Sequence, residues 1–208
     1  MRKYRTPLGW PQRDSQCHRF PLPNSVWMYN LRPAEFVVLS YLCYRRSHGG
    51  MLALTEKELA RNLSMGLVTV RKHLAALERK GLVTTQGSLS SNALNHSSKN
   101  FFTLPNEIFL LPLPSSAVMV YSYLLFIEDR RSHQCHPSYN SIANHVGIAK
   151  NTAIKSIDAL LDAGLITMEH SRYYDSRGMK WIGNNLYTIL PVRNAVDAYH
   201  QRQLRAIS

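Results

Sequence analysis

One sequence pattern occurs twice in this chain, and that repetition limits the folds it can adopt. Leu22-Pro23-Asn24 recurs as Leu104-Pro105-Asn106 at an offset of 82 residues, and Gly81-Leu82 recurs as Gly164-Leu165 at an offset of 83. Many such matches in one order indicate two copies of one structural unit. We therefore predict a tail at residues 1–19, a first domain at 20–100, a second domain at 101–191 and a short amphipathic helix within 192–208.

Helix signals in the first unit predict three helices. Pro33 suits the first turn of a helix. Thr55, followed three residues later by Glu58, has the spacing of a capping box at the start of a second, short helix. A third helix is predicted over residues 67–80 because its apolar positions recur at i, i+4 and i+7, and Gly81 ends it.

Strand signals follow the third helix. The β-branched segment Leu82–Thr85 predicts one strand, and Phe101–Thr103 predicts its partner across a loop rich in Ser and Asn at residues 87–98. Three helices followed by a two-stranded hairpin are the elements of a winged helix-turn-helix. The predicted fold class is therefore mainly α with small β-hairpin wings, built as two tandem winged helix-turn-helix domains.

The spacing of caps, apolar positions and glycine in the first unit resembles a known group of DNA-binding domains. The resemblance is to the winged-helix domains of plasmid and mobile-element replication initiators and their DnaD-like relatives, and it rests on Thr55, Leu59-Ala60, Leu63, Thr69-Val70, Lys72, Leu74, Leu77 and Gly81-Leu82-Val83. The second unit is similar from Ser138 to Ile166. The resemblance implies a DNA-binding fold. Many transcription regulators share the pattern, so a regulatory role stays open beside replication.

The third helix of such a domain lies in the major groove, where outward side chains reach base edges. If Val70 faces the core, an advance of 100° per residue fixes which positions face outward. These positions and their neighbours are Val68, Thr69, Arg71, Lys72, Ala75 and Arg79. The cations suit contacts with phosphates and guanine. The alternative is that they merely solvate an exposed helix face.

The matching helix of the second unit has a different outward face. Asn151 can read adenine through two hydrogen bonds, whereas Asp158 and Asp162 would repel phosphates. The hairpin that follows compensates, because residues 171–181 mix three cations with aromatic side chains. The candidate DNA-binding residues of this unit are Lys150, Asn151, Thr152, Lys155, Arg172, Arg177 and Lys180.

Net charge separates the two units. The chain has 25 Lys and Arg against 13 Asp and Glu, for a net charge of +12, of which residues 1–100 carry +10 and residues 192–208 carry +2, while residues 101–191 are neutral. A cationic excess is the electrostatic footprint of a nucleic-acid binder. We expect the first unit to dominate DNA affinity and the second to add wing contacts and a homodimer interface. The basic tail is either an arm that enters an adjacent groove or a segment that folds onto the first unit or stays disordered.

Motifs of other functional classes are missing from the sequence. It has no dinucleotide-binding, P-loop or zinc-protease motif, and no pair of carboxylates stands out for acid–base catalysis, so we predict neither an enzyme nor a cofactor. His133, Cys135 and His136 cluster, but zinc sites draw on two separated ligand pairs and no second pair is apparent, so we predict no metal site. No apolar stretch approaches the ~18 residues of a membrane span.

These features lead to one hypothesis with two alternatives. We predict a cytoplasmic bacterial protein, associated with the nucleoid or a plasmid, that binds specific double-stranded DNA as a homodimer. It would be a replication initiator or regulator of a plasmid, phage or conjugative element, with replication or transcription proteins as further partners. The alternatives are a chromosomal transcriptional regulator and a winged-helix adaptor that binds only proteins. Two readers per chain imply a site longer than one half-site, with repeats ~10 bp apart.

Overall fold

The computed structural model describes residues 18–49, 54–84, 88–90, 100–174 and 179–207. Three predictions lie wholly or mostly outside these ranges: the tail up to residue 17, the loop at residues 87–98, and Arg177 in the second wing. For Arg172 and Lys180 the structure describes the strand positions but not the side chains.

The two halves of the chain share a strand, a 3-10 helix and three α-helices in the same order, and the second half has further strands and a last helix. The first half comprises β1 (Arg19–Pro23), the 3-10 helix η2 (Asn24–Tyr29), α1 (Pro33–Ser47), α2 (Glu56–Asn62) and α3 (Leu67–Arg79). The second half comprises β2 (Phe101–Pro105), the 3-10 helix η3 (Asn106–Leu110), α4 (Ser115–Ile127), β3 (Gln134–Cys135), α5 (Tyr139–Val146), α6 (Lys150–Asp162), β4 (Ile166–Tyr174), β5 (Lys180–Ile189) and α7 (Val192–Ile207). The predicted fold class, mainly α with small antiparallel wings, is confirmed.

Local sequence signals account for the helix ends of the first half. Pro33 is the first residue of α1. Thr55 and Glu58 form the predicted capping box, in which the amide of Thr55 donates to Glu58 Oε2 at 2.8 Å and the amide of Glu58 donates to Thr55 Oγ1 at 3.3 Å. Gly81 follows α3 with φ +71°, a left-handed conformation that glycine adopts without strain, so it ends the helix as predicted.

The first wing differs from the predicted one. Val83 bridges Leu89 in a short hairpin of residues 82–84 and 88–90, and Phe101–Pro105 pairs instead with Arg19–Pro23 in the antiparallel β1–β2 ribbon. The prediction that Phe101–Thr103 completes the first wing is therefore wrong. The cause is burial, because alternate apolar residues of both ribbon strands enter the shared core: Phe20, Leu22, Phe102 and Leu104.

Arg19 also lies elsewhere than predicted. It belongs to β1 rather than to the tail, and its guanidinium donates to Thr103 through Nε to Oγ1 at 2.9 Å and through a terminal nitrogen to the carbonyl oxygen at 2.7 Å. This cation therefore ties the two halves of the chain together, and we remove it from the charge of the proposed arm.

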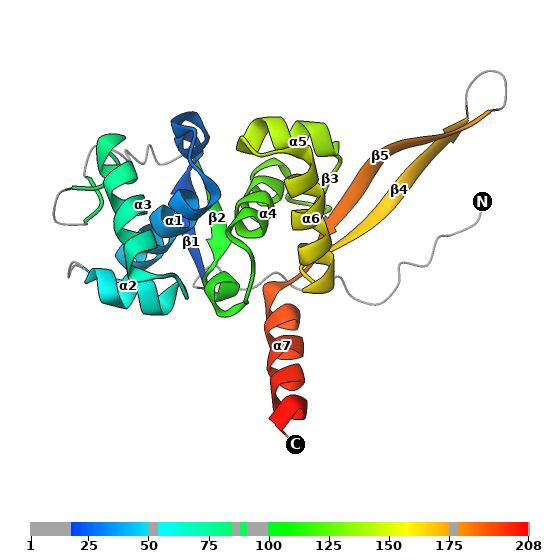
Figure 1. Ribbon diagram of the computed structural model, residues 1–208. Coiled ribbons are helices and arrows are strands. Elements are labelled where there is room, and N and C mark those ends of the chain that lie inside the picture. Colours follow the sequence, from blue (N-terminus) through cyan, green and yellow to red (C-terminus); the bar gives the residue numbers. More distant parts are fainter. Residues whose placement is uncertain (1–17, 50–53, 85–87, 91–99, 175–178, 208) are drawn as a thin grey trace.

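The second wing is the long hairpin β4–β5, which projects from the molecule in Figure 1. A third strand, β3, pairs with β5, so the sheet order is β3-β5-β4. The register shifts between His170 and Arg172, beyond which Arg172 lies opposite Ile182. The predicted cations Arg172 and Lys180 thus occupy the outer part of the hairpin.

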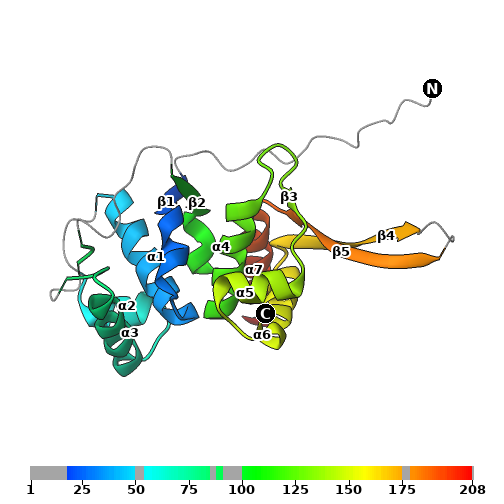
Figure 2. The ribbon, with the colours of Figure 1, turned by 90° about the horizontal axis from the view of Figure 1, so that it is seen from above.

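The core runs through both halves without a break. Helices α1 and α4 pack against each other at the centre, with α2 and α3 beyond α1 and α5 and α6 beyond α4 (Figure 1). Seen from above, α3 and α6 lie along one side of the molecule, and the β1–β2 ribbon lies on the opposite side (Figure 2). Helix α7 buries Val192, Ala195 and Val196 and packs near η3. Within the described ranges, no helix is both long and apolar enough to cross a bilayer.

Candidate nucleic-acid interface

Helix α3 has one buried side and one exposed side. Val70 and Leu77 are fully buried and hold the helix against α1. On the other side, Val68 is 79% exposed, and Lys72 and Arg79 are also exposed. Val68 therefore offers an apolar group on the exposed side of α3, which suits contact with a thymine methyl.

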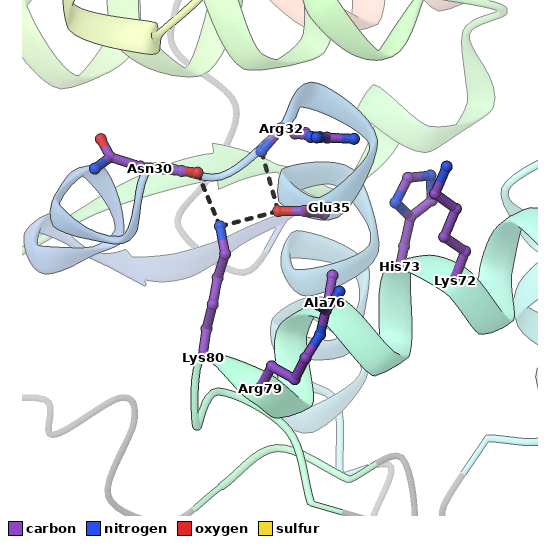
Figure 3. Close-up of a pocket in the computed structure, with 8 residues that line it drawn as sticks. All are labelled: Asn30, Arg32, Glu35, Lys72, His73, Ala76, Arg79 and Lys80. Atoms are coloured by element: carbon purple, nitrogen blue, oxygen red, sulfur yellow. Dashed lines mark hydrogen bonds and ion pairs between the residues drawn. The ribbon is translucent and has the colours of Figure 1, made fainter.

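Lys72 and Arg79 border a hollow between α3 and the start of α1, with a volume of about 490 Å³ (Figure 3). Five basic side chains and one carboxylate line this hollow. The residues that line it are Asn30, Arg32, Glu35, Lys72, His73, Ala76, Arg79 and Lys80. The hollow is therefore predominantly cationic.

Among the described residues that line this hollow, Glu35 is the only carboxylate, and it is already neutralised. Its Oε2 accepts from Lys80 Nζ at 3.1 Å and from the backbone amide of Arg32 at 3.1 Å. Burial on its own raises the pKa of Glu35, but the bonds from Arg32 and Lys80 outweigh it and hold that pKa below the ordinary value. Lys80 also donates to the carbonyl of Asn30 at 2.8 Å. Within the described residues, Lys72 and Arg79 have no carboxylate partner, so their charges face an incoming anion.

His73 contributes little charge to the hollow at neutral pH. Burial lowers its pKa, and the nearby cations Lys72 and Arg32 lower it further, while Glu35 acts in the opposite direction. Its ring is therefore neutral under ordinary conditions. A bound phosphate would favour its protonated form.

Arg71, a predicted contact residue, is directed toward α2. Its Nε donates to Glu56 Oε2 at 2.6 Å, and its side chain is 59% exposed. This exposed ion pair joins α2 to α3 and contributes little stability. Thr69 is exposed in the first turn of α3. That turn begins after Gly66, which has no side chain to cap the backbone amides.

Helix α6 repeats the arrangement with different side chains. Ala153, Ile157 and Leu160 are buried. The predicted residues Lys150, Asn151 and Lys155 are exposed, and Thr152 is half-buried. Asp158 and Asp162 are exposed along the same face, as the helical spacing predicts. This face therefore mixes cations near the start of α6 with carboxylates near its end.

The predicted residues fall into three separate groups. Val68, Lys72 and Arg79 share the face of α3, and the four residues of α6 form a second group. The strand positions of Arg172 and Lys180 lie on the projecting hairpin, away from α3 (Figure 1). Sequence reasoning missed Arg32, His73 and Lys80, because the hollow forms only when α1 and α3 pack together. The available signal was the basic residue before Pro33.

The second half of the fold has the geometry of a known domain. Helices α5 and α6 are joined by a turn at Gly147, whose φ is +68°, and both pack with α4. Residues 111–166 match the model of a helix-turn-helix domain. This segment is therefore similar to a helix-turn-helix domain. Its second helix is α6, and α3 occupies the corresponding place after α1 and α2.

Comparison with solved structures gives distant matches. A possible transcriptional regulator from Methanosarcina mazei Go1 is 15% identical over 46% of this chain and 73% of its own, with a TM-score of 0.32. No curated protein matches the chain.

Two cysteine side chains, Cys43 and Cys135, lie in the described part of the chain. The thiols of Cys43 and Cys135 are buried, and burial raises the pKa of each to about 12. In the part of the chain that is described, no group of three His, Cys, Asp or Glu side chains is placed to hold a metal ion.

Proposed function

We propose that this chain binds specific sites on duplex DNA, with α3 inserted in the major groove and α6 and the β4–β5 wing making further contacts. The observation that carries the proposal is the exposed face of α3, where Val68, Lys72 and Arg79 lie together beside a cationic hollow. Lys and Arg side chains donate hydrogen bonds to phosphate oxygens and to the acceptor atoms of guanine, and the exposed valine offers an apolar surface to the methyl group of thymine.

Two further features support DNA as the partner. The net charge of +12 favours association with a polyanion. A helix-turn-helix domain is present in the second half, where the outward Asn151 and Lys155 stand near the start of α6. Groove contacts in this fold come from the first turns of the second helix. Thr69 and Thr152 hold matching places in α3 and α6.

The finer role that we propose is initiation of replication, or regulation, of a plasmid, phage or conjugative element. The sequence resemblance to mobile-element initiators supports it. A chromosomal transcriptional regulator is the second candidate, because transcriptional regulators use the same domain. In either role the chain acts through DNA rather than through catalysis, and cytoplasmic action beside a nucleoid or plasmid belongs to the same proposal. Replication or transcription proteins would act as further partners, and a homodimer would place four readers on one site.

Selection of bound fragments from genomic DNA tests the proposal. The full chain is immobilised, fragments of genomic and plasmid DNA are applied at low salt, and retained fragments are sequenced. We expect enrichment of one short motif, located at an origin if the chain is an initiator and upstream of genes if it is a transcriptional regulator. Retention of no duplex at low salt would refute DNA binding and favour the adaptor alternative.

A further inference from the structure

The β1–β2 ribbon pairs the two halves through an approximate two-fold axis. The repeat offset here is 82 residues, so Phe20 corresponds to Phe102 and Leu22 to Leu104. In the ribbon, Phe20 pairs with Leu104, and Leu22 pairs with Phe102. Each pair is thus the image of the other, and at the centre Pro21 pairs with its own counterpart, residue 103. This reciprocal register is what a two-fold axis through the ribbon requires.

Aromatic packing follows the same axis. Trp27 of the first half stacks on Phe102 of the second half, and its counterpart Phe109 stacks on Phe20 of the first half. The ring contacts of Trp27 in the second half include Phe102, Tyr123 and Phe126, at centroid distances of 5.8, 5.9 and 5.9 Å. Those of Phe109 are the counterparts Phe20, Tyr41 and Tyr44, at 5.8, 5.1 and 5.6 Å. Each contact that a residue of the first half makes with the second half is therefore repeated with the two halves exchanged. This reciprocity defines an isologous interface.

The packing of the helices is related by the same approximate two-fold axis. Helix α1 packs against α4, α3 packs against α1, and α6 packs against α4. Helices α3 and α6 have the same length of 13 residues. In Figure 1, α2 lies at the lower end of the left half and α5 at the upper end of the right half, as a half-turn about the line of sight requires. Figure 2 shows α3 and α6 on the same side of the molecule.

We propose that one chain reads an inverted, imperfectly palindromic DNA site, with α3 on one half-site and α6 on the other. This inference rests on the proposed function. Two recognition helices related by a two-fold axis meet the two DNA strands with opposite polarity, so the symmetry of the site mirrors that of the protein. The two halves of the site differ in sequence because the outward residues differ: Val68, Ala75 and Arg79 on α3 against Asn151, Asp158 and Asp162 on α6.

A symmetrised chain tests the arrangement. The substitutions Asn151→Val, Asp158→Ala and Asp162→Arg give α6 the outward side chains of α3, since Thr152 and Lys155 already match Thr69 and Lys72. The three replaced side chains are exposed, so the fold is retained. The probes are synthetic duplexes with two copies of the half-site protected by α3, in inverted or direct order, at the spacing of the selected site.

We expect the symmetrised chain to bind the inverted duplex roughly tenfold or more tightly than the direct one. The control Glu169→Ala with Asp197→Arg adds the same net charge at exposed positions outside α6, and we expect it to show no gain specific to the inverted duplex. Equal affinity for the two duplexes, or preference for direct order, overturns the inverted arrangement. If the wild-type chain binds selected DNA, the proposed function survives that result, whereas failure to bind any duplex overturns both.

A second measurement uses the wild-type recognition faces. A DNA-cleaving chelate is attached at Val68→Cys or Asn151→Cys in a Cys17→Ser background, since Cys43 and Cys135 are buried. We expect two cleavage patterns that mirror each other about the centre of the site, with strand polarity reversed. Two patterns of the same polarity contradict the inference.

Discussion

Lys72 and Arg79 lie two turns apart on α3, so their side chains point to the same side of the helix. Replacing both with alanine removes two cations without disturbing a buried contact, because both are exposed. We predict that Lys72→Ala with Arg79→Ala weakens binding to the selected duplex roughly ten- to hundredfold, as loss of a base or phosphate contact does. Fluorescence anisotropy at fixed salt measures the effect.

The matched control for this prediction is Arg202→Ala on α7. Arg202 donates to a carbonyl four residues earlier at 3.2 Å, just as Arg79 does at 3.3 Å, and both are exposed. It lies outside α3 and should leave affinity within about twofold. If Lys155→Ala weakens binding more than the α3 double variant, the assignment of the two units is reversed.

The lowered pKa of Glu35 makes the stability of the fold depend on pH. Its pKa is lowered in the folded chain, so the stabilisation that its ionised form provides is present above its unfolded pKa and is lost as pH falls through the lowered value. We predict that Glu35→Gln lowers the free energy of unfolding at pH 7 by about 1–3 kcal/mol, since Lys80 keeps its backbone acceptors but loses its charged partner. The difference from wild type should shrink below about pH 4. Urea unfolding at pH 7 and pH 3 measures both values, and a difference that grows toward pH 3 would contradict the ion pair.

Individual elements could be predicted from the sequence where a local signal specifies them. Thr55 with Glu58, Pro33 and Gly81 fix helix ends through backbone hydrogen bonds and φ angles, and the outward face of α3 follows from helical spacing. The partner of Phe101–Pro105 could not be predicted locally. Its choice depends on which distant strand completes the shared core, and Arg19–Pro23 lies about eighty residues away. The hollow at Arg32 and Lys80 was missed for the same reason.

The β1–β2 ribbon should make the two halves unfold together. Leu22 is fully buried and pairs with Phe102, so Leu22→Ala opens a cavity between the halves. We predict a loss of about 2–5 kcal/mol in unfolding free energy, with amide exchange accelerated in α3 and α6 alike. Hydrogen exchange followed by mass spectrometry reads both helices in one experiment. Acceleration confined to α1–α3 would indicate that the halves unfold independently.

The molecule as a whole joins two similar halves of unequal charge. Residues 20–100 carry a net charge of +6, while residues 101–191 are neutral and carry the projecting hairpin. A shared core holds the halves in one arrangement, so the positions of α3 and α6 are set before any DNA arrives. Such preorganisation reduces the ordering cost of binding. If the proposed function is right, the first half supplies most of the affinity for DNA, and the different outward side chains of the second half make the two half-sites differ in sequence.

The salt dependence of DNA affinity tests whether duplex phosphates meet this cationic surface. Each neutralised phosphate releases counterions, so the logarithm of the association constant falls with the logarithm of salt concentration by about 0.9 per contact. For the selected duplex we predict a linear plot with a slope of roughly −4 or steeper, the value for about five contacts. A slope near zero, or no binding at the lowest salt, would contradict the account.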